Sequence, residues 1–134
     1  MALNVRGVMD GLGSAVSGLE GLVAAYGYPP MNVETPAAVV GLPDSVEYDT
    51  TMGSHRLTIP VWILVSRTGD GMGIQLVADY ANDSGNKSLK AEIEANTTLN
   101  GVAASTRVID AEFVNQDWNG TNFLAVLFTI EILT

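Results

Sequence analysis

The sequence predicts an α+β fold: a mainly antiparallel sheet flanked by an N-terminal helix and a short helical middle segment. Three observations lead to it. Apolar residues recur at helical spacing over residues 4–25, strict alternation marks two long segments at 55–67 and 122–133, and polar turns with short helical patterns lie between them. Because 134 residues is the size of one ordinary domain, we treat 1–134 as a single domain.

Residues 4–25 are expected to form the first helix, since its apolar residues recur at steps of three and four. The opposite side carries small residues, among them Gly7, Gly11 and Gly18. Each glycine inside a helix costs about 1 kcal/mol relative to alanine, so the pattern needs a reason. Either another backbone approaches closely there, such as one from a neighbouring subunit, or this side is a loosely specified solvent face.

The first half of the chain then becomes a series of short strands. Gly27 ends the helix and Pro29-Pro30 prevents it from resuming, after which 31–34, 36–41 and 46–49 are strand candidates. The clearest strand is 55–67, whose residues alternate between two apolar faces. Because Pro60 has no N–H to donate, we expect a sheet edge or a bulge at that position.

The second half is predicted to form two short helices and a hairpin. Residues 74–81 and 88–95 have helical patterns, and Ser88 is a suitable N-cap for the second. Strands at 102–114 and 122–133 follow, and Asn119-Gly120 between them is typical of a hairpin turn.

Composition narrows the functional class. Charged residues make up only 16%, against roughly 25% in an average domain, and 15 acidic and 6 basic residues give a net charge of -9. An apolar content of 47% argues against disorder, and six cations are too few for charge-driven nucleic-acid binding. Part of the surface must therefore be uncharged. The N-terminal segment lacks a signal-peptide pattern and the apolar runs are too short to span a membrane, so we expect neither export nor membrane insertion.

Few residues are suited to catalysis. The chain has no cysteine, and His55, its only histidine, lies in a polar loop without a nearby nucleophile motif. The turn Gly69–Gly73 lacks the lysine of a phosphate-binding loop. Asp44, Glu47 and Asp49 surround one turn, where they form either a weak cation site or, as we favour, a solvated acidic loop. We predict no catalytic residue, no cofactor and no metal site.

Several segments resemble a family of small virion proteins of long-tailed phages that infect actinobacteria. The resemblance includes Val46 to Gly53 and the strand 57–66. Its most specific part is Tyr48-Asp49-Thr50-Thr51-Met52-Gly53 followed by a strand of the type Thr58-Ile59-Pro60-Val61-Trp62. Residues 36–41, 88–95 and 123–133 continue the resemblance in the same order, so that it extends over nearly the whole chain. The glycine-rich first helix and the turn at 69–73 depart from common members.

The resemblance implies a tail terminator or a related head–tail connector protein, located in the neck of the virion and assembled in the host cytoplasm. Such proteins form a homo-oligomeric ring, typically a hexamer, that caps the major tail tube protein and joins it to the connector (stopper) protein. The implied fold is a small sandwich of sheet and helices. A stopper or other connector ring is the alternative reading. A small-molecule binding domain, or a weak hydrolase using His55, is a remote one.

A ring built from one chain needs a heterologous interface, with a centre poor in charge and rich in aromatic residues and methionine. On this basis we predict that the interface includes the following residues: Gly7, Gly11, Gly18, Thr50, Met52, Arg56 and Trp62. DNA passes through the lumen of such a ring without specific binding. We expect Asp44, Glu47 and Asp49 to face that lumen, where their charge would repel phosphates.

Overall fold

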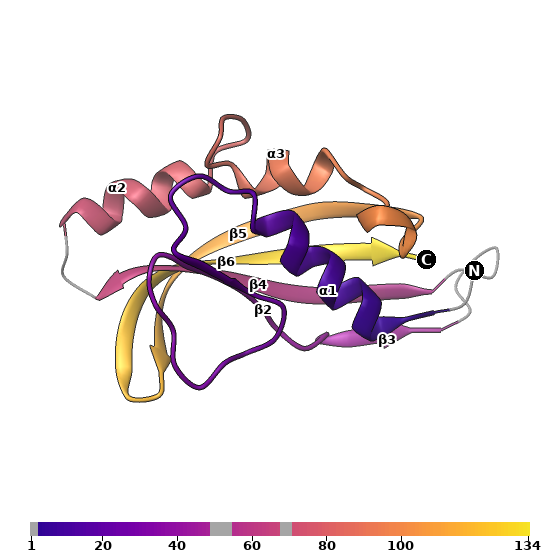
Figure 1. The fold of residues 1–134 in the computed structure, drawn as a ribbon, viewed down its shortest axis with the longest axis horizontal. Helices are drawn as coiled ribbons and strands as arrows, with labels where there is room; N and C mark the ends of the chain where they lie inside the picture. Colours follow the sequence, from indigo (N-terminus) through magenta and orange to yellow (C-terminus); the bar gives the residue numbers. More distant parts are fainter. Residues whose placement is uncertain (1–2, 49–54, 68–70) are drawn as a thin grey trace.

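The fold class predicted from the sequence is confirmed. The computed structural model describes residues 3–48, 55–67 and 71–134. They form a mixed α+β fold with a six-stranded, mostly antiparallel sheet (Figure 1). The elements in chain order are α1 (Val5–Val16), β1 (Ala24–Tyr26), β2 (Ala37–Val40), β3 (Ser45–Glu47), β4 (Arg56–Arg67), α2 (Gly71–Tyr80), α3 (Leu89–Glu94), the 3-10 turn η2 (Leu99–Gly101), β5 (Ser105–Trp118) and β6 (Thr121–Leu133).

The sheet has the order β1-β2-β4-β6-β5, and β3 pairs with β4 beside β2. Among the strand pairs of the described residues, β1 and β2 alone are parallel. One long side of the sheet therefore ends in β1 and β3, and the other ends in β5. In β4, which has neighbours on both sides, the alternation that identified it separates a fully buried face from one that is partly exposed.

The helices cover one face of this sheet, and the main core lies between them. From β4 this face contributes Ile59, Val61 and Ile63, and from β6 it contributes Phe128 and Ile130. The helical side contributes Val8, Leu12 and Val16 of α1, Val77 and Tyr80 of α2, and Leu89 and Ile93 of α3. Burial of these side chains is the main stabilising contribution in a domain of this size.

The bulge or edge expected in this strand at Pro60 is not in β4 itself, where Pro60 pairs regularly with Thr129 and the register shift lies between Leu64 and Ser66. The gap beside Pro60 lies in the neighbouring strands, between β2 and β3. Gly41 N donates a hydrogen bond to Pro60 O (2.8 Å), and Asp44 N donates one to Thr58 O (2.7 Å). Between these bonds the chain leaves the sheet at Leu42 and Pro43, which separates β2 from β3. The backbone of Pro60 faces this gap, where no residue of β2 or β3 requires an N–H donor from position 60.

The first helix is shorter than predicted. α1 ends at Val16 instead of continuing to residue 25, although Leu19 remains buried in the core. Gly21 has a φ of 88°, which only glycine adopts readily, and the chain then enters β1. The apolar spacing continued past the true end of the helix because Leu19 packs on the same core from a turn.

The strand predicted at 31–34 is also wrong, because these residues lie in the loop that joins β1 to β2. The other predicted elements are confirmed with shifted ends. Ser88 caps α3 by accepting a hydrogen bond from Ala91 N (3.0 Å). Asn119 and Gly120 both have positive φ, 52° and 88°, as a two-residue hairpin turn requires.

Candidate functional site

The face of the sheet opposite the helices, here called the helix-free face, carries the features that a core does not explain. It is built from the alternate residues of the strands: Ser45 and Glu47 of β3, Arg56, Thr58 and Trp62 of β4, Glu131 of β6 and Arg107 of β5. One end of this face is aromatic and the other end is charged.

At the aromatic end, Trp62 and Trp118 pack edge to face, with ring centroids 5.9 Å apart. Trp118 Nε1 donates a hydrogen bond to Pro30 O (2.8 Å), which fixes the β1–β2 loop against the β5–β6 hairpin. With Val39 and Leu64 these residues form a second, smaller apolar cluster. Trp62, predicted at a subunit interface, is therefore half-buried against groups of its own chain.

At the charged end, four side chains of alternating sign cross the sheet from one edge to the other. Arg56 Nη1 lies 3.1 Å from Glu47 Oε2, and Arg56 Nε lies 3.9 Å from Glu131 Oε2. Arg107 Nη2 lies 3.8 Å from Glu131 Oε1. We call the set Glu47, Arg56, Glu131 and Arg107 the charged row. The row begins with an acid on β3 and ends with a base on β5.

The predicted interface glycines lie against groups of the same chain. An added Cβ at Gly11 would come within 3.0 Å of Leu99 Cβ, and one at Gly18 within 2.6 Å of Glu92 Oε1. At Gly7 it would meet the side chain of Asn4, the N-cap of α1. The close approaches that the glycines permit are thus made inside the domain. They do not by themselves require a neighbouring subunit.

The remaining predicted site residues fall into two groups. Asp49, Thr50 and Met52 lie outside the described residues. Asp44 and Glu47 are both exposed, as a lumen-facing role would need, but Glu47 is paired with Arg56. Their placement in a lumen stays a prediction.

His55 lies directly before β4, where its backbone pairs with that of Thr134: His55 N donates to Thr134 O (3.2 Å) and Thr134 N donates to His55 O (3.0 Å). Its ring packs edge to face against Tyr48. Among residues 3–48, 55–67 and 71–134 there is no group of three or more His, Asp or Glu side chains placed to hold a metal ion.

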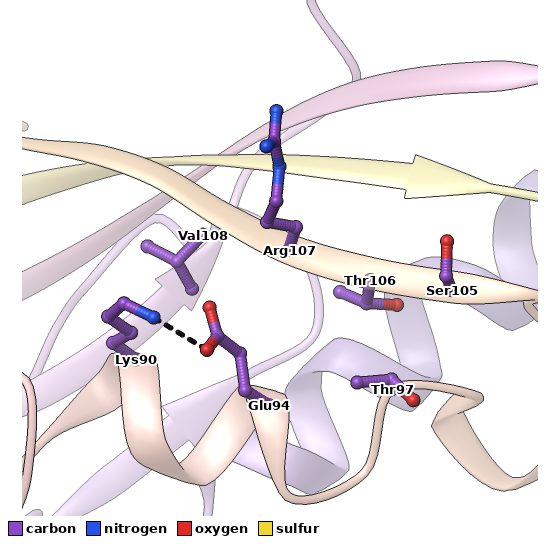
Figure 2. Close-up of a pocket in the computed structure, with 7 residues that line it drawn as sticks. All are labelled: Lys90, Glu94, Thr97, Ser105, Thr106, Arg107 and Val108. Carbon is purple, nitrogen blue, oxygen red and sulfur yellow. Dashed lines mark hydrogen bonds and ion pairs between the residues drawn. The ribbon is translucent and has the colours of Figure 1, made fainter.

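A groove of about 520 Å³ runs between α3 and β5 (Figure 2). Thr106 and Val108 point into it from β5, and Lys90 and Glu94 of α3 lie opposite, 2.5 Å apart between Nζ and Oε1. Arg107 points to the other side of β5, onto the helix-free face. The groove therefore lies beside the positive end of the charged row.

Exposed large apolar side chains gather along the two sides of the sheet. Val23, Leu42 and Tyr48 lie next to β1 and β3, whereas Ile109 and Phe113 lie on β5. Three more are exposed elsewhere in the described chain: Tyr28, Met31 and Ile74. Composition predicted an uncharged surface, and the structure places much of it at the sheet edges. The charged row was missed because its members are brought together only by strand register.

The hydroxyl of Tyr80 is a perturbed titratable group. Burial raises the pKa of the Tyr80 hydroxyl, and the carboxylates of Glu20 and Asp79 raise it further. The hydroxyl donates a hydrogen bond to Glu20 O (3.0 Å), so it ties α2 to the segment that follows α1. This tyrosine contributes to the core and lies away from the helix-free face.

Comparison with known families and with curated proteins found no match to either. Within the described part of the chain, none of the helices is long and apolar enough to cross a membrane.

Proposed function

We propose that this chain is a structural subunit of a phage tail, which forms a ring at the end of the tail tube and joins the tube to the head–tail connector. A hexamer is the expected ring. The observation that carries the proposal is the exposure of apolar side chains on two opposite sides of one sheet, Val23, Leu42 and Tyr48 on one side and Ile109 and Phe113 on the other. The role is one of assembly and not of catalysis.

Two different adhesive sides on one domain are what a ring subunit needs. A ring of identical chains forms when one surface of each subunit binds a different surface of the next. Apolar side chains at such surfaces lose contact with water when the neighbour binds, which favours association. Exposed apolar residues scattered singly would need no explanation, but these are grouped by sheet edge.

The resemblance in sequence supports the same conclusion. Its most specific part begins at Tyr48, directly after β3, and includes Thr58 to Trp62 of β4, which is the side of the sheet with Leu42. The α+β fold agrees with the fold that the resemblance implies.

The acidic character also fits the proposed role. DNA must pass through the ring without adhering, and a net charge of -9 disfavours contact with phosphates. Asp44 is exposed on the β3 side and has no ion pair among the described residues, so we assign it to the lumen. Glu47 is paired with Arg56 and is therefore not counted among the acids that face DNA.

The test is attachment to tail tubes. Purified chain should bind the end of tubes assembled from the major tail tube protein, and electron microscopy should show a ring at one end only. Its partner on the other side should be the connector protein. Binding to the connector without binding to tubes would assign the chain to the stopper instead, and binding to neither would contradict the proposal.

A further inference from the structure

The charged row is open at both edges of the sheet, and its two ends have opposite sign. Across β3, β4, β6 and β5 the order is acid, base, acid, base. Among the described residues, Glu47 at one end and Arg107 at the other each have an ion-pair partner on one side only. The Arg107 side chain is 67% exposed and that of Glu47 is 55% exposed.

We infer that a second copy of this chain continues the row: β5 of one copy lies beside β3 of the next, and Arg107 pairs with the neighbour's Glu47. This inference rests on the proposed function, because it names the interface of the proposed ring. A two-fold contact between identical edges would join ends of the row with the same sign. Only a head-to-tail contact keeps the signs alternating, and head-to-tail contacts are the ones that close into rings.

The direction of the strands, and the position (height) of paired residues along them, agree with this contact. β3, β4, β6 and β5 are antiparallel in sequence across the sheet, so β5 of one copy runs antiparallel to β3 of the next when the sheet continues. Register places Ser45, Thr58, Glu131 and Arg107 at one height. Arg107 would therefore reach the neighbour's Glu47 by the same diagonal step of two residues that joins Arg56 to Glu131 inside the chain.

Two exposed apolar residues, Ile109 on β5 and Leu42 on the opposite edge, would also meet at this contact. Asp110 pairs with Thr129 and Thr129 with Pro60, which places the bulged residue Ile109 near the height of Pro60. Leu42 leaves the opposite edge at that height, between the bonds that Gly41 and Asp44 make to β4. Leu42 is 69% exposed and Ile109 is 45% exposed. Contact between them would remove both from water while the charges set the register.

The part of the edge strand β5 up to Asp110 is available for such pairing; beyond it, at the position of Glu112 to Val114 along the strand, β1 already occupies the outer edge of β2. Within the described residues β5 pairs only with β6, and it is 14 residues long. It carries neither proline nor lysine, two devices by which proteins commonly protect a sheet edge. The bulge between Val108 and Asp110 and the charged side chains of Arg107, Asp110 and Glu112 protect this edge in part, and Ile109 at the bulge is exposed.

The experiment is an exchange of charge between two variants. Arg107→Glu spoils the β5 edge and Glu47→Arg spoils the β3 edge, so each variant alone should associate at least about tenfold more weakly than the unmodified chain, about 1.4 kcal/mol. In an equimolar mixture every contact can again join opposite charges, because the two variants alternate. Sedimentation over a concentration series should show association restored in the mixture. Arg6→Glu and Glu34→Arg, exposed positions outside the row, are the matched controls and should associate normally.

Cross-linking gives a second readout that also captures a weak contact. The chain contains no cysteine, so Ser45→Cys and Ser105→Cys each introduce a single thiol, one on either edge. A short bifunctional maleimide should join these two variants to each other far more than it joins either one to a Ser84→Cys control on an exposed turn. Unfolding curves for every variant show whether the monomer is intact.

Four outcomes decide the matter. Restoration in the mixture together with the selective cross-link supports the inference. The inference would be overturned if all variants associate equally, or if the mixture associates no more strongly than either variant alone. It would also be overturned if the cross-linking yield is no higher than with the Ser84→Cys control. If rings bind tube ends while the exchange has no effect, the proposed function stands and this interface is wrong. If association is restored in the mixture of charge variants but the chain binds no tube, the interface stands and the proposed function is wrong.

Discussion

The two faces of the sheet use the same strands for different purposes. On the helix-covered face every second residue of β4 from Leu57 to Ile63 is a buried aliphatic, and three helices cover it. On the helix-free face the alternate positions of the same strand are Arg56, Thr58, Pro60 and Trp62. A smaller apolar cluster occupies one end of this face and ion pairs occupy the other.

The difference indicates where stability and association reside. A continuous apolar core supplies most of the stability of a small domain, whereas exposed ion pairs contribute little to it. Substitutions on the first face should therefore unfold the domain, and substitutions in the charged row should change only how copies meet. Substitutions on the two faces of the sheet test this division.

Truncation of the main core should have the largest effect. Phe128 is 2% exposed on β6, and Phe128→Ala should lower the free energy of unfolding by about 3–5 kcal/mol, because it removes apolar contacts and leaves a cavity. Urea denaturation followed by circular dichroism measures this. The neighbouring Thr129 points to the helix-free face, and Thr129→Val should change stability by less than about 1 kcal/mol. Equal losses in the two variants would remove the distinction between the faces.

An added methyl group at Gly41 should disturb the packing at the aromatic end of the helix-free face and lower stability. An added Cβ at Gly41 would come within 2.6 Å of the Trp62 ring and 2.9 Å of Pro60 Cγ. Gly41→Ala should therefore cost about 1–3 kcal/mol in thermal or urea unfolding, since the ring must shift. Gly27→Ala is the control, because its nearest contact is an ordinary 3.6 Å to Asp10, and it should be close to neutral. A neutral result at Gly41 would show that the tryptophan cluster is loosely packed.

The buried hydroxyl on the core side predicts a pH effect. Because the pKa of Tyr80 is raised in the folded state, folding favours the neutral phenol. Its contribution is fully present below the unfolded-state pKa of about 10 and is lost as the pH rises above that value.

Tyr80→Phe should cost about 1 kcal/mol at neutral pH through the hydrogen bond to Glu20 O, and it should reduce the loss of stability in alkali. Unfolding measured near neutral pH and again above pH 10 separates the two effects. An undiminished alkaline loss in Tyr80→Phe would assign that loss to other groups.

The smallest effect on stability is expected in the charged row. Arg56 is 45% exposed, and Arg56→Met should change the free energy of unfolding by less than about 1 kcal/mol. A melting curve of the monomer tests this. A loss of several kcal/mol would mean that the row holds the sheet together and is not reserved for a neighbour.

Much of the fold could be predicted because its signals are local. The alternation in β4 and β6, the Asn119-Gly120 turn and the Ser88 cap all act over a few residues, and each is where the sequence placed it. β1 could not be found in this way, since its three residues gain strand structure only by pairing with β2. The loop at 31–34 was mistaken for a strand because its apolar Val33 packs on the tryptophan cluster instead.

The candidate site was harder to predict because it depends on register. Arg56 and Glu47 were both singled out, but for separate roles, and their pairing follows from a β3–β4 alignment that the sequence does not specify. Arg107 and Glu131 were not singled out, since each is an ordinary charged residue on a strand. The available signal was that all four fall on the polar alternation of their strands with alternating sign.

The size of the assembled species tests the account most directly. Sedimentation of the chain alone, and of the chain with the major tail tube protein, should reveal a discrete ring-sized particle, about six times the 14.1 kDa of one chain. A species that remains strictly monomeric under both conditions, at concentrations where a folded core is verified, would contradict it.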